Sequence, residues 1–182
     1  MIIKYYYSLI TRFLLALVVT LNYPLFYVIL APITLYLSYF ILNLFYDTIL
    51  IGSSIGVNGL GFKFIEACVA PAAYYLLFVL IIGLKDLDWK SGLKMFFYGS
   101  LLILAMNVLR IIILIVLDVE FGKSYFDAVH LVFWTFLSGL YVALVWIFLV
   151  KRFRVRKIPF YSDLNYFYKK SLLKRSKTKV NK

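Results

Sequence analysis

Uninterrupted apolar runs constrain the fold of this chain more than any other feature of its sequence. In stretches such as 101–106 and 111–117, large apolar residues follow one another without intervening polar positions. A bilayer core of about 30 Å requires roughly twenty apolar residues per helical crossing, whereas the strands of a membrane barrel alternate in polarity over about ten residues. The runs therefore predict transmembrane helices and exclude a transmembrane barrel.

Composition supports a membrane protein, since 64% of the 182 residues are hydrophobic and only 15% are charged. A soluble domain of this length could not bury so many apolar side chains. We expect an all-α integral membrane protein, a polytopic helical bundle of about five transmembrane helices, within a range of four to six. No small-residue cleavage site follows the N-terminal apolar run, so this run is expected to be retained rather than removed as a signal peptide.

Breaks in the apolar runs predict where the helices begin and end. Two N-terminal spans, 5–21 and 24–45, are separated at Asn22, Tyr23 and Pro24, because proline lacks the backbone donor that a helix needs. Arg12 would cost about 2.5–3.5 kcal/mol near the centre of a span, so a single kinked span starting at Phe13 is the alternative.

The rest of the chain divides into one long loop and three further spans. Segment 47–63 contains four glycines and two serines, which predicts a loop with short extended or re-entrant pieces. The three spans are expected at 64–84, 93–117 and 126–150, joined by the charged loops 85–92 and 118–125. Residues 1–150 would then form the membrane domain.

The C-terminal tail, 151–182, predicts the orientation of the bundle. It holds twelve of the twenty basic residues and a single acid, Asp163, and cationic segments stay on the cytoplasmic side. Counting back from a cytoplasmic tail places 118–125 and 47–63 outside and 85–92 inside. The tail is expected to contact anionic lipid head groups, and no binding module or aromatic stacking pattern points to nucleic acid.

With this orientation, three rare polar groups lie in the outer half of three consecutive helices. Cys68 and His130 come about four residues into spans that start outside, and Arg110 lies roughly 10 Å below the outer end of its span at 1.5 Å per residue. An arginine inside a membrane is costly and normally faces a partner or a wet cavity. Asn107 precedes Arg110 by three positions and shares its helical face.

Each of these residues also has a structural explanation. A lone cysteine in an apolar helix is commonly a small buried hydrophobe, Arg110 could extend its side chain to the interface, and His130 could form a hydrogen bond between helices. Pro71 suits the first turn of a helix, which predicts that Cys68 lies near a helix N-terminus, where the dipole favours the thiolate. One cysteine and one histidine are too few ligands for catalytic zinc, so we expect no metal and no cofactor.

In their order and spacing, these residues resemble the exosortase and archaeosortase family of membrane transpeptidases. The matching pattern is Glu66-Ala67-Cys68 at the start of one span, Asn107-Val108-Leu109-Arg110 late in the next, and His130 at the start of the last. Val69-Ala70-Pro71 and the pair Tyr74-Tyr75 look closer to the archaeal branches, and the additional arginine of the bacterial form has no counterpart here.

The resemblance implies a membrane-embedded cysteine transpeptidase or protease whose catalytic part is 64–150. Such an enzyme cleaves C-terminal transmembrane sorting signals of surface proteins on the extracytoplasmic side of the cell membrane and transfers these proteins to a lipid or glycan acceptor. Cys68, Arg110 and His130 would be catalytic, with Asn107 and Glu66 in support. The alternative is a non-catalytic membrane subunit or small transporter that uses Arg110 and His130 as counter-charges.

Overall fold

The computed structural model describes residues 2–84 and 87–155, and this part of the chain is mostly helical, as predicted. Helices and one small sheet follow in the order α1 (Ile2–Leu21), α2 (Pro24–Leu42), β1 (Thr48–Ile51), β2 (Ser54–Val57), β3 (Leu60–Lys63), α3 (Glu66–Val69), α4 (Pro71–Ile82), α5 (Trp89–Phe121), α6 (Lys123–Val132), the π-helical turn η1 (Phe133–Leu137) and α7 (Ser138–Arg152).

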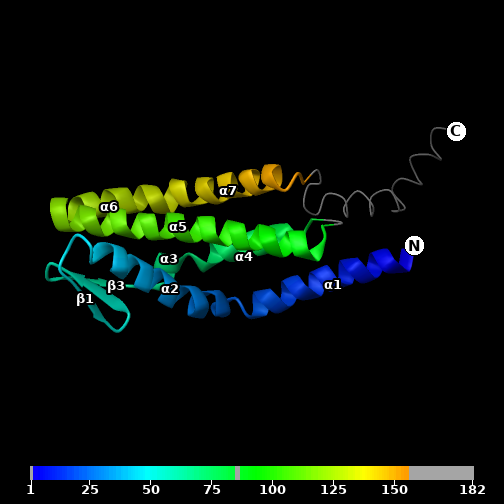
Figure 1. Cartoon of the computed structure of the whole chain (residues 1–182), viewed down its shortest axis with the longest axis horizontal. Helices are drawn as coiled ribbons and strands as arrows, with labels where there is room; N and C mark the ends of the chain where they lie inside the picture. The colour runs from blue at the N-terminus through cyan, green and yellow to red at the C-terminus, as the bar shows by residue number, and fades with distance from the viewer. Residues whose placement is uncertain (1, 85–86, 156–182) are drawn as a thin grey trace, which may run out of the picture.

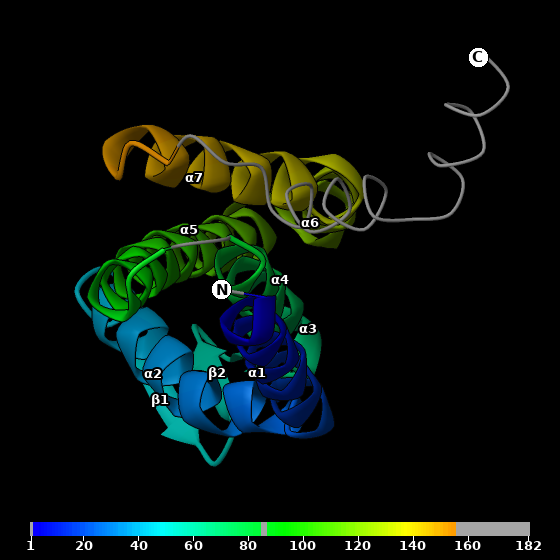
Figure 2. The same ribbon diagram turned by 90° about the vertical axis from the view of Figure 1, so that its right-hand side faces the viewer.

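The helices form an elongated bundle with the sheet at one end (Figure 1). Helix α5 runs the length of the bundle and contacts α2, α4, α6 and α7. Viewed from the opposite end, α1 lies beside α4 and next to the start of α2 (Figure 2). Most of the predicted basic tail, 156–182, lies outside the described residues.

The predicted bundle of five spans is only partly seen. Within the described ranges, α2 and α5 are the two helices that are long and apolar enough to cross a membrane. The predicted span 64–84 is instead divided into α3 and α4, because Ala70 adopts the left-handed conformation, with φ 52° and ψ 50°. Pro71 follows directly, and proline disfavours the right-handed helical conformation at the preceding residue. The prediction that Pro71 occupies a helix first turn is confirmed.

The other helix boundaries differ from the predictions in informative ways. The N-terminal break falls where it was expected, since α1 ends at Leu21 and α2 begins at Pro24. The two helices follow one another in the same direction along the bundle (Figure 1), as in the kinked alternative. The predicted outer loop 118–125 is wrong, because α5 continues to Phe121 and only Gly122 separates it from α6. Gly122 has φ +84°, a conformation that glycine adopts without a steric penalty, and this permits the abrupt reversal.

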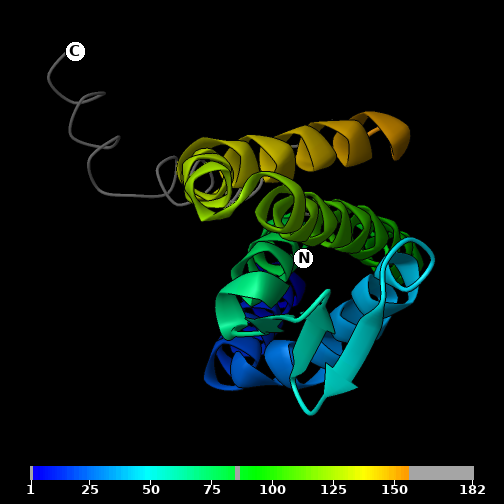
Figure 3. The same ribbon diagram turned by 90° about the vertical axis from the view of Figure 1, so that its left-hand side faces the viewer.

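Segment 47–63 forms a three-stranded antiparallel sheet in the order β1-β2-β3, so the predicted extended pieces are present. Asn58 and Gly59 connect β2 to β3 with φ values of 47° and 82°, the pair of positive φ values of a type I′ hairpin turn. The inner face of the sheet buries Ile55 and Val57 in a cluster with Leu42 and Ile115 of the two long helices. Figure 3 shows the sheet end, with β2 and β3 beside the short helix α3.

A second apolar cluster holds α4, α5 and α7 together at the other end of the bundle. The helices approach most closely at Gly99 of α5, where an added Cβ would lie 2.6 Å from Leu77 of α4 and 2.7 Å from Leu149 of α7. Small residues at such crossings allow the backbones of packed helices to come near one another.

Candidate active site

Cys68 lies on the short helix α3, between the end of β3 and the start of α4. Its side chain is half-buried and packs against the apolar cluster beneath the sheet. Cys68 lies near a helix N-terminus, as predicted, but this helix is the four-residue α3, because Ala70 ends it two residues later and α4 begins only at Pro71. The four residues of α3 align few peptide dipoles, so the thiol receives little help from a helix dipole.

Two side chains of α5 hold this turn in place. The amide nitrogen Nδ2 of Asn107 donates to the carbonyl oxygen of Cys68 at 2.6 Å. The Nη2 group of Arg110 donates to the carbonyl oxygen of Ala67 at 2.9 Å and to that of Cys68 at 3.4 Å. The two donors that the sequence placed on one helical face therefore converge on the backbone around Cys68.

Arg110 also reaches toward α7. Its Nη1 group lies 3.5 Å from the hydroxyl of Ser138, which itself donates to the carbonyl oxygen of Phe133 at 2.7 Å. Its Nε atom is buried and has no hydrogen-bond partner among the described residues. One guanidinium group thus links α3, α5 and α7 and keeps its positive charge inside the bundle.

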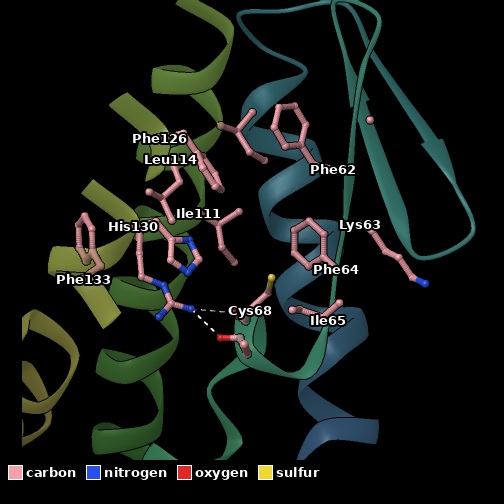
Figure 4. Close-up of a pocket in the computed structure, with 14 residues that line it drawn as sticks. Phe62, Lys63, Phe64, Ile65, Cys68, Ile111, Leu114, Phe126, His130 and Phe133 are labelled. Atoms are coloured by element: carbon pink, nitrogen blue, oxygen red, sulfur yellow. Dashed lines mark hydrogen bonds between the residues drawn. The ribbon is translucent and has the colours of Figure 1, made fainter. Parts of the chain in front are cut away.

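His130 enters the site from α6, far along the chain from Cys68. Its ring packs on Phe126, one helical turn earlier, with 5.4 Å between the ring centroids. Figure 4 shows the imidazole and the Cys68 sulfur on opposite walls of the cavity, with the side chain of Ile111 between them in this view. The two rings are tilted by 41°, so Phe126 packs against the imidazole and limits its orientation.

Cys68, Arg110 and His130 line one cavity of about 280 Å³. Its walls come from β3, α3, α5, α6 and η1, and they are mostly apolar (Figure 4). A thiol, a guanidinium and an imidazole from three separate helices thus share a space large enough for a short piece of extended peptide. Among the described residues, no three His, Cys, Asp or Glu side chains are placed to hold a metal ion.

The two residues predicted to support the site lie outside this cavity. Asn107 is buried behind the turn that carries Cys68, and its amide is occupied by the carbonyl oxygen of that residue. Glu66 is exposed and lines a neighbouring groove of about 670 Å³ between α4 and α7. Arg110 borders both spaces.

Sequence reasoning missed three contributors to the site. Ser138 neighbours the guanidinium, Phe126 packs against the imidazole, and residues 61–65 form one wall of the cavity. The spacing of four between Phe126 and His130 was a usable signal, because residues four apart are neighbours on a helix. Ser138 has no such local link to Cys68 in the sequence, and β3 ends five residues before Cys68 but lies in the segment that was predicted as a loop.

Comparisons with known protein families, with characterised proteins and with solved structures found no match for this chain.

Proposed function

We propose that this chain is a membrane-embedded cysteine peptidase of the transpeptidase type. The observation that carries the proposal is the shared cavity of Cys68, Arg110 and His130, which are far apart in the sequence. Covalent acyl transfer requires at least a nucleophile such as a thiol, a group that transfers protons and a fixed positive charge. The family resemblance of the same three residues points to the same chemistry.

The proposed setting is the cell membrane, which the chain crosses four to six times, with the basic tail in the cytoplasm. Helices α2 and α5 are long and apolar enough to cross a membrane. The sheet end of the bundle, which holds the cavity, lies opposite the end at which α7 leads into the tail (Figure 1). A cytoplasmic tail then puts the cavity toward the extracytoplasmic face.

In the proposed reaction, the Cys68 thiol first passes its proton to His130, and the resulting thiolate attacks the carbonyl carbon of the scissile peptide bond. The carbon–nitrogen bond then breaks, a thioester to Cys68 forms, and His130 gives a proton to the departing amine. An acceptor nucleophile next attacks the thioester, loses its proton to His130 and releases the Cys68 thiolate. The Arg110 charge stabilises the thiolate and the oxyanion of each tetrahedral intermediate.

Asn107 has a positioning role in this scheme. Because its amide already donates to the Cys68 carbonyl oxygen at 2.6 Å, it holds the nucleophile's backbone instead of contacting the oxyanion. The substrates would be surface proteins with a C-terminal transmembrane sorting signal, and the acceptor a lipid or a glycan. Water in place of the acceptor would give simple proteolysis.

Replacing Cys68 with Ala tests this function directly. In cells that carry the Cys68→Ala variant, we expect surface proteins with an apolar C-terminal helix and a basic end to keep their full length. Mass spectrometry of their C-termini would measure the change, and the mass of the processed form in the parent strain distinguishes an attached acceptor from hydrolysis.

The matched control is Ser124→Ala, which removes a small polar group from the exposed start of α6, outside the cavity. This variant should process its substrates normally. Normal processing by Cys68→Ala at equal protein abundance would refute the peptidase and favour the counter-charge role of Arg110 and His130.

A further inference from the structure

The wall of the cavity formed by β3 is the open edge of the sheet. The strand order is β1-β2-β3, so β3 pairs with β2 on one side only. Residues 61–65 all line the cavity, although consecutive residues of a strand face opposite sides of a sheet. No residue of β1 or β2 lines it. Residues on opposite faces of β3 can line one cavity only if that cavity lies beside the free edge of the strand. The cavity therefore runs along this edge.

The register of the hairpin shows which backbone groups point out of this edge. Leu60 pairs with Val57 across a two-residue turn, and Phe64 donates to the carbonyl oxygen of Ser53 at 2.9 Å. In an antiparallel pair, every second residue bonds to the partner strand. Leu60, Phe62 and Phe64 therefore face β2, whereas the N–H and C=O groups of Gly61 and Lys63 point outward. Within the described residues, these outward groups have no hydrogen-bond partner.

Side chains leave this edge accessible. In Figure 4 the Lys63 side chain points away from Cys68, so this residue contributes its backbone to the cavity wall. Gly61 has no positive φ, and an added Cβ would meet no atom within 4 Å. Neither backbone conformation nor packing inside the protein therefore requires glycine at position 61. A glycine at position 61 instead leaves open space beside the strand.

We propose that the outward edge of β3 binds the substrate as an extended peptide strand and carries its scissile bond to Cys68. Main-chain hydrogen bonds to Gly61 and Lys63 would hold the strand, as in other cases where a peptide adds to a sheet edge. The chain passes from Lys63 to Cys68 within five residues, so a strand paired with β3 ends beside the thiol. The proposal rests on the proposed peptidase function, for which it supplies the mode of substrate binding.

The test measures how fast Cys68 is alkylated in the purified full-length protein in detergent. Two reagents are compared: iodoacetamide, and the tripeptide reagent acetyl-Ala-Ala-Ala chloromethyl ketone. In both reactions the sulfur forms a bond to carbon and a halide ion leaves. After correction for the rates with free N-acetylcysteine, we expect the tripeptide reagent to react at least about tenfold faster, because two added hydrogen bonds hold it. N-methylation of its backbone nitrogens should remove this gain.

A pair of proline variants assigns the gain to the edge of β3. Lys63→Pro removes one outward N–H group beside the cavity without removing a bond to β2. Leu50→Pro is the matched control. Leu50 of β1 lies opposite Ile55, at a position that does not hydrogen-bond to β2, so its N–H group points out of the opposite edge of the sheet. We expect Lys63→Pro to lose the tripeptide gain over iodoacetamide and Leu50→Pro to keep it.

Three results would overturn the pairing: no gain with the native chain, a gain that survives N-methylation, or an equal gain in Lys63→Pro. If a proline variant does not fold, the N-methylated reagent on the native chain decides. The result is independent of the Cys68→Ala processing test. If the tripeptide gain is absent but processing still depends on Cys68, only the binding mode is refuted. If the tripeptide gain is present but processing does not depend on Cys68, the peptidase function is refuted.

Discussion

Arg110 shows how a single charged residue can organise the interior of an apolar bundle. Its guanidinium contacts two carbonyl oxygens of α3 and the hydroxyl of Ser138. An arginine presents five donors in a rigid fork, whereas lysine offers a single point charge. The carbonyl oxygens partly compensate the cost of burying this charge, and they fix the turn that presents Cys68. At this scale, structure and chemistry depend on the same side chain.

Asn107 provides a test of positioning at the residue scale. Asn107→Leu keeps the branched shape of the side chain but leaves the Cys68 carbonyl oxygen with only the 3.4 Å contact to Arg110. We expect the free energy of unfolding to fall by about 1–3 kcal/mol, the usual penalty for an unsatisfied buried polar group. The iodoacetamide rate of Cys68 should also change, because the turn relaxes.

Ser138→Ala is the comparison for this prediction. It removes a hydroxyl whose contact with Arg110 is 3.5 Å long, so its effect should be smaller, about 1 kcal/mol or less. Thermal and denaturant unfolding in detergent measure both variants. An equal loss in the two variants would contradict a special role for the Asn107 amide.

At the scale of elements, α5 is the helix on which the others pack. Its N-terminus is capped by Asp88, whose side chain accepts a hydrogen bond from the backbone N–H of Ser91 at 2.9 Å. Its N-terminal half carries Gly99 between α4 and α7, and its C-terminal half carries Asn107 and Arg110. Local capping and close packing therefore set the position of the site residues along the helix.

The crossing at Gly99 predicts opposite effects for two glycine-to-alanine changes. Alanine in a helix is favoured over glycine by roughly 0.5–1 kcal/mol. At Gly99 the new methyl group would meet the buried side chains of Leu77 and Leu149 below 3.0 Å, and such overpacking costs about 1–3 kcal/mol. Gly99→Ala should therefore lower the unfolding temperature. Gly139→Ala, where nothing lies within 4 Å, should leave it unchanged or raise it.

The cap of α5 predicts a dependence of stability on pH. The hydrogen bonds from Ser91 lower the pKa of the Asp88 carboxyl from its usual value of 3.8. The stabilising contribution of Asp88 is therefore complete above pH 3.8 and is lost as the pH falls through the lower pKa of the folded state.

Asp88→Asn keeps a capping oxygen but does not titrate. Melting curves in detergent between pH 6 and pH 3 should show the parent chain losing stability relative to Asp88→Asn at the acidic end. Parallel curves for the two proteins over this range would contradict the assignment.

At the scale of the whole molecule, the sheet lies at one end and the C-terminal end of α7, which leads into the basic tail, lies at the other (Figure 1). Connected helices carry the chain from one end to the other, with α1 starting at the tail end and α6 starting at the sheet end (Figure 1). The charge distribution complements this arrangement, since the tail holds twelve of the twenty basic residues. The proposed orientation puts the sheet outside and the tail inside.

Single cysteines introduced into a Cys68→Ala background test this orientation. Ser53→Cys lies in the exposed turn between β1 and β2, and Ser176→Cys lies in the tail. A maleimide that cannot cross membranes should label the first variant in intact cells and the second only after permeabilisation. Labelling of Ser176→Cys in intact cells would reverse the orientation and move the cavity to the cytoplasmic side.

Several elements of the fold were predictable because they depend on neighbouring residues. Pro24 and the residues before it mark the break between α1 and α2, and long apolar runs mark α2 and α5. Asn58-Gly59 is a strong signal for a hairpin turn, which would have turned the predicted loop with extended pieces into a sheet. The division at Ala70 was harder to foresee, since alanine favours helices and the proline after it was read as the start of the helix alone.

By itself, the sequence determined the helical character of the chain and the candidates Cys68, Arg110 and His130, because run length and residue rarity are properties of the sequence. Only the tertiary structure decided that these three residues line one cavity, that Asn107 and Arg110 hold the backbone of Cys68, and that the edge of β3 borders the thiol. These relations join residues about forty or more positions apart, or a strand edge to a helix. Local conformational preferences do not encode such contacts, because they arise when separate apolar faces pack together.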